Sequence, residues 1–201
     1  MLVEVNPENP EPRKIRRAVD ALARGDIIAY PTDTVYGLGC DLMNKKAVDN
    51  LYAMKGMPKT QFLAFVCRDI AEITTYAVLH DREYRILRRC LPGPYCFILP
   101  ATREVPRIVQ TPRKHVGVRV PNHAVAPALV RELGHPIISS TAARPGHEPH
   151  VDPKEIDVEF PGLSLVLDGG PGRTLPTTVV DLTDASPVIV REGAGDAAPF
   201  R

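Results

Sequence analysis

Short apolar runs alternate with segments of helical periodicity along this chain, and this alternation limits the fold more than any other sequence feature. Helical periodicity is clearest in residues 11–25 and 45–55, whereas the C-terminal part holds short strand-like runs joined by Gly, Pro and Asp. The runs typical of strands are residues 26–30, 62–67, 95–99, 116–120, 136–139, 163–167, 178–182 and 187–191. This order predicts an α/β (α+β) domain, a single mixed sheet flanked by helices.

Capping residues predict where the helices begin and end. Asn44 is expected to cap the helix over residues 45–55, and Gly25 to end the helix before it. The other expected helices are a short one capped by Asp69, a basic one capped by Asp81 that runs to Cys90, and residues 123–133, closed by Gly134.

The chain length of 201 residues suits one core, so residues 1–201 are expected to form a single domain. No apolar run approaches the roughly 20 residues that a membrane-crossing helix needs. The first residues are acidic and proline-rich, without the order of a secretory signal. A cytoplasmic protein that does not contact a membrane is therefore expected.

Several common chemistries have no signature here. The sequence has no phosphate-binding G-x-x-x-x-G-K-[ST], no G-x-G-x-x-G, no G-x-S-x-G and no H-E-x-x-H. Cys40, Cys67, Cys90 and Cys96 lack C-x-x-C spacing, which favours reduced thiols over a disulfide or metal site. His147 and His150 are the best metal candidates, but Pro149 keeps them off one helix face, so no metal site is expected.

The net charge of +1 is unevenly distributed. Residues 82–119 carry nine Lys or Arg against two acids, a net of +7, while residues 145–201 carry four against ten, a net of −6. A basic block of this kind can hold an anionic ligand or nucleic acid, or it can be a solvated helix face.

Loops beside the strands hold hydroxyls, small residues and single cations. These loops are residues 30–39, 55–58, 118–121, 139–146, 176–178 and 190–193. Lys55, Arg119 and Arg191 are the separated cations, and Thr32 and Thr34 follow a buried strand. Such a set suits a polyanion and a small polar substrate, with positioning and charge stabilisation of a phosphoryl or adenylyl transfer.

Six motifs, in order and spacing, resemble the YrdC-like family of threonylcarbamoyl-AMP synthases. They are YPTDTVYGLG, AVDNLYAMKG, LPGPY, VGVRVP, PIISST and PTTVVDLTDASPVIVREGAG, and the match as a whole runs from about residue 11 to residue 196. The resemblance implies an open, twisted sheet with a concave basic surface. It also implies a nucleotidyltransferase-type enzyme that condenses L-threonine, bicarbonate and ATP, with Mg²⁺, into threonylcarbamoyl-adenylate for the t6A modification of tRNA. Some family members are described as binding double-stranded RNA.

The resemblance also implies roles for individual residues. Arg119 matches the arginine that clamps the threonine carboxylate in a bidentate manner, and Lys55 matches the lysine of a Lys-x-Arg-Pro motif. The substrate-binding set is Thr32, Thr34, Arg119, Thr141 and Thr177, and the nucleotide-binding set is Lys55, Gln61 and Arg191, with Lys55 and Arg119 as catalytic residues.

Departures from the family pattern gather on the nucleotide side. Met57 replaces the arginine of Lys-x-Arg-Pro, and Ala143 replaces the asparagine of Ser-Ala-Asn. Further departures are His115, Pro145 and Cys96. Each lost charge-assisted bond to phosphate is worth about 1.5–3 kcal/mol, or roughly tenfold to a hundredfold in affinity.

The departures resemble the YciO branch of the family. Two alternatives to a working synthase follow: a YciO-like relative that binds double-stranded RNA or a nucleotide through a basic concave surface, and an adenylating enzyme for another small acid. RNA binding through phosphate contacts would weaken steeply with salt.

Overall fold

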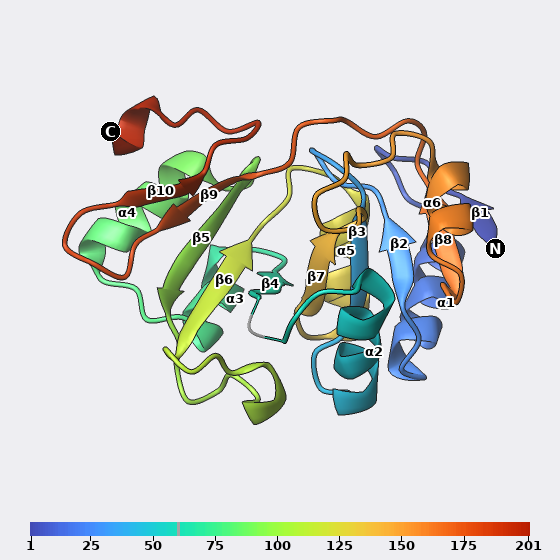
Figure 1. Ribbon diagram of the computed structural model, residues 1–201, viewed down its shortest axis with the longest axis horizontal. Helices are drawn as coiled ribbons and strands as arrows, with labels where there is room; N and C mark the ends of the chain where they lie inside the picture. Colours follow the sequence, from blue (N-terminus) through green and yellow to red (C-terminus); the bar gives the residue numbers. More distant parts are fainter. Residues whose placement is uncertain (60) are drawn as a thin grey trace.

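The computed structural model describes residues 1–59 and 61–201, and these form one mixed sheet with helices on both faces (Figure 1). The strands are β1 (Leu2–Glu4), β2 (Ile28–Tyr30), β3 (Gly37–Asp41), β4 (Ala64–Val66), β5 (Tyr95–Pro100), β6 (His115–Arg119), β7 (Ile137–Thr141), β8 (Leu165–Asp168), β9 (Thr178–Asp181) and β10 (Val188–Arg191). The helices are α1 (Pro12–Ala23), α2 (Lys45–Lys55), α3 (Ile70–Tyr76), α4 (Asp81–Cys90), α5 (Val125–Leu133) and α6 (Pro153–Glu159), with 3₁₀ turns η1 (Arg107–Val109) and η2 (Ala198–Phe200).

The sheet is open, and its strand order is β1-β8-β2-β3-β7-β4-β6-β5-β9-β10. Parallel pairs (β1 with β8, β8 with β2, β4 with β6, β5 with β9) are mixed with antiparallel ones. The predicted single domain on an open mixed sheet is confirmed. No helix among the described residues is both long and apolar enough to cross a membrane.

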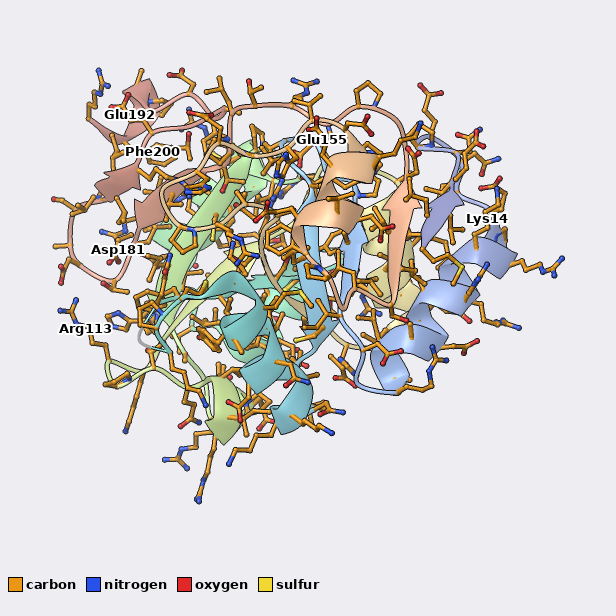
Figure 2. All side chains as sticks on the ribbon, turned by 45° about the vertical axis from the view of Figure 1, so that its right-hand side comes forward. Lys14, Arg113, Glu155, Asp181, Glu192 and Phe200 are labelled. Carbon is orange, nitrogen blue, oxygen red and sulfur yellow. The ribbon has the colours of Figure 1, made fainter. Side chains whose placement is uncertain are left out.

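Helices α1 and α5 pack side by side and bury their apolar faces on one part of the sheet. Their core includes Val19 and Leu22 of α1 and Leu129 of α5, together with Val66 of β4. Lys14 of α1 points away from the sheet, as the opposite face of an amphipathic helix should (Figure 2). A larger apolar cluster includes residues of α2, α3, α4 and α6.

Helix α2 forms where local signals predict it. The Asn44 side chain accepts a hydrogen bond from the Ala47 N–H at 3.1 Å, and Gly56 ends the helix in the left-handed region at φ 65°. The predicted ends at Asp69 and Gly134 are also observed.

The prediction for α4 is wrong by one residue at its start. Asp81 lies inside the helix, and His80 precedes it as the capping position. The Glu83 carboxylate accepts a hydrogen bond from the His80 backbone N–H at 3.1 Å, so the acid that supports the helix start is Glu83.

Strand β3 corrects the prediction that residues 30–39 form a loop. Residues 37–41 are the second strand of a hairpin with β2, and only residues 31–36 form the connection. Glycine is required at positions 37 and 39 because the side chain of Tyr30 lies over strand β3. A Cβ atom on Gly39 would lie 2.9 Å from Tyr30 Cε1 and 2.7 Å from Ile137 Cγ2.

The Asn44 cap gives a first prediction. We expect Asn44→Ala to lower the free energy of unfolding by about 1 kcal/mol, because the Ala47 N–H loses its partner. Asn50→Ala, on the exposed face of the same helix, is the matched control, since alanine inside a helix is at least neutral. Urea unfolding followed by circular dichroism measures both. Equal stabilities of the two variants would contradict this account of the helix start.

Candidate functional site

A cavity with a volume of about 610 Å³ opens on one face of the central strands. Residues two apart along a strand point to the same face, which places Gly117 beside Arg119, and Ala64 beside Val66, on its floor. Val66 also belongs to the core beneath α1 and α5, so the cavity begins where these two helices stop covering the sheet. Its volume suits a small-molecule ligand.

Strand register aligns Arg119 and Arg191 on this face. Val179 of β9 pairs with Arg191 on one side and with Cys96 of β5 on the other, and the β5–β6 register brings Cys96 opposite Arg119. Strands lie about 4.8 Å apart, so these three steps separate the two backbones by about 14 Å. Both arginines line the cavity, with small side chains between them.

Arg119 contacts the turn between β2 and β3 through one nitrogen. Its Nη2 donates to Thr32 Oγ1 at 3.1 Å, Asp33 Oδ1 at 2.5 Å and Thr34 Oγ1 at 2.8 Å. Thr32 and Thr34 are both buried, and neither is among the described residues that line the cavity. Their hydroxyls therefore hold the guanidinium from behind, and Asp33 is its counter-ion.

Lys55 is a buried cation at the end of α2. Its Nζ donates to the Thr141 carbonyl oxygen at 2.5 Å, which links α2 to the end of β7. Burial, and secondarily the charge of Arg191, lower the pKa of Lys55 from its ordinary 10.5 to about 8. The lysine thus lies in a positive region that holds no carboxylate partner for it among the described residues.

Arg191 and Thr177 form the third polar part of the cavity. Arg191 Nη2 donates to the Thr177 hydroxyl and carbonyl, each at 2.9 Å, and Nε donates to the same carbonyl at 3.1 Å. Burial lowers the pKa of Arg191, and nearby Arg119 lowers it further. The Thr177 side chain is thereby fixed at the cavity wall.

The cavity brings together most of the predicted site residues. Besides those just described, Gln61 and Thr141 line it, as do Met57, Ala143, Pro145 and Cys96, four of the five departures from the family pattern; His115 does not. Met57 is buried in the large apolar cluster and offers only apolar contact. Which of these residues bind a ligand stays a prediction.

Two features of the site were missed in the sequence. The floor of the cavity is a sheet face made of small residues such as Gly117 of β6 and Ser139 of β7. The sequence predicted instead that loops at the ends of strands form the site. Arg144, the second feature, lines the cavity and ion-pairs with Glu159 of α6 while its guanidinium lies 5.5 Å from the Phe160 ring centre. An arginine directly after the replaced Ser-Ala-Asn motif was the available signal.

The basic block over residues 82–119 does not form the cavity. Arg119 is the only one of its cations among the described lining residues. Arg82 instead donates to the Asp184 carbonyl at 2.8 Å and to the Leu182 carbonyl at 3.3 Å, tying α4 to the segment before β10. Arg88, Arg89 and Arg113 are exposed. Arg88 and Arg89 therefore lie on the solvent-facing side of α4, whereas Arg113 lies outside that helix, between η1 and β6.

The four cysteines are free thiols, and burial raises the pKa of Cys96 in the cavity to about 11. Among residues 1–59 and 61–201, no three His, Cys, Asp or Glu side chains gather in an arrangement that could hold a metal ion.

An open mixed sheet with a cavity lined by Lys55, Arg119 and Arg191 places this protein in the α/β class, and comparison with known proteins gives the family. Residues 20–193 match the Sua5/YciO/YrdC family model, described as "Telomere recombination". The chain belongs to the Sua5/YciO/YrdC family.

Three relatives are informative. The Escherichia coli K12 protein YciO is 41% identical over 199 residues, 98% of this chain and 97% of that protein. Its crystal structure superposes with a TM-score of 0.96 over 100% of this chain and 99% of that chain at 38% identity. A Yersinia pestis protein named threonylcarbamoyl-AMP synthase is 34% identical over 167 residues, 81% of this chain and 88% of that protein.

The third relative is the P. abyssi Sua5 protein, whose crystal structure is complexed with L-threonine. It superposes with a TM-score of 0.88 at 31% identity, covering 96% of this chain and 57% of that chain. The fold and family expected from the sequence are therefore confirmed.

Proposed function

We propose that this protein is an L-threonylcarbamoyladenylate synthase with a weakened nucleotide half-site. The observation that carries the proposal is the convergence of Lys55, Arg119 and Arg191 on one cavity. The Yersinia pestis synthase and the threonine-bound P. abyssi Sua5 support it as relatives.

In the proposed reaction, the amino group of L-threonine and bicarbonate form a carbamate with loss of water. A carbamate oxygen then attacks the α-phosphorus of Mg-ATP, and the bond to the β-phosphate breaks to release pyrophosphate. Negative charge grows on the phosphoryl oxygens, and fixed cations lower its energy without rearranging. A cytoplasmic location is part of the proposal, since ATP and free amino acids are found there.

We assign the threonine carboxylate to Arg119, which carries a fixed positive charge on the cavity. Because Nη2 is occupied by the turn and Nε is buried, the contact is assigned to Nη1, and the bidentate clamp that the resemblance implies does not fit this arrangement. The hydroxyls of Thr141 and Thr177 are available for the polar groups of the substrate threonine, while Thr32 and Thr34 hold the guanidinium.

We assign the nucleotide phosphates to Lys55 and Arg191. Gln61, an exposed residue that lines the cavity, is assigned to the nucleotide as well. Met57 and Ala143 supply no charge and no amide, so we expect weaker ATP binding than in a relative that has the full motifs.

The test measures pyrophosphate release by the purified protein with L-threonine, bicarbonate and Mg-ATP, beside the Yersinia pestis synthase. We expect release that stops when L-threonine or bicarbonate is omitted, with a higher KM for ATP than the control enzyme. Folded protein that releases no pyrophosphate above the omission controls contradicts the proposal.

Lys55 gives the proposed site a pH dependence. Its pKa of about 8 lies below the ordinary 10.5, so burial disfavours its charged form, and a bound anion favours that form. Binding of pyrophosphate should therefore take up protons near pH 8 and weaken as the pH rises through this value. Calorimetric titration in buffers of different ionisation enthalpy measures the uptake.

The same titration on Lys55→Gln is the control, because proton uptake by pyrophosphate itself is still present in this variant while that by Lys55 is absent. An identical pH dependence in the two proteins would contradict the assignment of Lys55 to the phosphates.

The stability of the ligand-free protein should change with pH in the opposite direction. Below about pH 8, Lys55 is charged in the folded protein, and burying this charge destabilises the fold. As the pH rises from about 8 toward 10.5, this penalty is lost, so the contribution of Lys55 to the free energy of unfolding rises.

A further inference from the structure

Among the described residues, Asp33 is the one carboxylate that forms an ion pair with Lys55, Arg119 or Arg191 of the cavity, whereas Arg144, a further lining cation, pairs with Glu159. Asp33 lies in the turn between β2 and β3, and its Oδ1 is 2.5 Å from Arg119 Nη2. Both side chains are nearly buried, 12% exposed for Asp33 and 11% for Arg119. An ion pair as buried as this one is screened little by salt.

The pair is made end-on, through one atom of each partner. Arg119 Nε and Asp33 Oδ2 are both buried, and neither has a hydrogen-bond partner among the described residues. Nη2 already has three acceptors on the turn. Nη1 is thus the guanidinium nitrogen that can meet a ligand in the cavity that Arg119 lines.

Charge repulsion acts against this placement of Arg119. Lys55, Arg119 and Arg191 line the same cavity. Their mutual effect is seen in two pKa values, because Arg119 lowers the pKa of Arg191 and Arg191 lowers that of Lys55. Without an opposing charge, a flexible arginine would move away from the other two. Asp33, fixed in a turn by Thr32 and Thr34 at its sides, supplies that charge.

We propose that Asp33 is a positioning residue that holds Arg119 with Nη1 toward the cavity, so that the site accepts an amino-acid carboxylate. The identity of that ligand as L-threonine rests on the proposed function. Asp33 leaves Lys55 and Arg191 untouched, and the binding of polyanions to them should not require it. The two ligand classes therefore separate its effect from a general loss of structure.

The experiment compares Asp33→Ala and Asp33→Asn with the unaltered chain and with Asp20→Asn, an exposed aspartate on α1. Calorimetry measures the Kd of L-threonine and, separately, of pyrophosphate. In Asp33→Ala we expect the threonine Kd to rise about tenfold or more, and the pyrophosphate Kd to stay within about twofold or to fall. Asp33→Asn keeps an oxygen acceptor for Arg119, so we expect a smaller rise in the threonine Kd than in Asp33→Ala.

NMR exchange of the Arg119 Nε proton with solvent is the ligand-free readout. The proton is expected to be protected in the unaltered chain and to exchange faster in Asp33→Ala, because the guanidinium is released. Unchanged or tighter threonine binding in Asp33→Ala overturns the proposal, as does an equal loss for threonine and pyrophosphate.

If L-threonine does not bind the unaltered chain, the proposed function fails, and the exchange rates still decide whether Asp33 fixes Arg119. Faster exchange in Asp33→Ala then supports the positioning role, and unchanged exchange overturns it.

Discussion

Arg119→Ala is expected to reduce threonine-dependent pyrophosphate release about a hundredfold or more. The variant removes the donor that we assign to the threonine carboxylate, and a charge-assisted contact at the upper end of the usual range, about 3 kcal/mol, corresponds to roughly a hundredfold. It also leaves Asp33 buried without its counter-ion, and breaking a buried pair in this way destabilises by about 3–5 kcal/mol. Activity and the unfolding transition must therefore be measured on the same preparation.

Two further variants separate chemistry from folding. Arg119→Lys keeps a positive charge for Asp33 but has one nitrogen in place of Nη1 and Nη2, so it cannot contact the turn and the ligand as arginine does. We expect a stable protein whose KM for threonine is much higher. Arg113→Ala removes an exposed arginine at the rim of the molecule (Figure 2) and should leave turnover unchanged. Full activity in folded Arg119→Ala would contradict the assignment of the carboxylate.

Lys55→Ala is expected to have the second largest effect, a loss of roughly tenfold to a hundredfold in affinity for ATP and pyrophosphate. Lys55 is the buried ammonium of the cavity, and Met57 gives no second charge two residues later. Because the lysine is buried at a charge penalty, its removal should not unfold the protein, although the Thr141 carbonyl loses a donor.

The matched control is Lys59→Ala, because Lys59 is an exposed lysine four residues further along, paired with Asp49 at 2.5 Å. An exposed pair of this kind contributes little to stability. We expect Lys59→Ala to bind nucleotide as the unaltered chain does. Similar losses in both variants would show that the effect is a general loss of positive charge and not the placement of Lys55 in the cavity.

Local signals predicted the elements whose ends depend on neighbouring residues. Helix α2 begins after Asn44 and ends at Gly56 because both caps act within one turn. Strand β1 was missed because its three residues are a strand only through pairing with β8, more than 160 positions away. Strand β3 was missed because Gly37 and Gly39 carry no strand preference, and the Tyr30 side chain that requires them lies on another strand.

The same division holds for the site. Lys55, Arg119 and Arg191 could be selected because each is a lone cation beside small residues and hydroxyls in a recognisable motif. Asp33 could not be paired with Arg119 from the sequence, since 86 positions separate them and the turn after β2 brings them together only when the sheet forms. The cavity floor was equally hidden, because it follows from the register of β4, β5, β6 and β7.

The central claim is that this cavity joins L-threonine, bicarbonate and the adenylyl group of ATP. The most direct measurement is mass spectrometry of the nucleotide product formed with isotopically labelled bicarbonate. The account predicts threonylcarbamoyl-adenylate that carries the bicarbonate label and does not form without L-threonine. ATP recovered unchanged, or an adenylate without the label, from folded protein would contradict it.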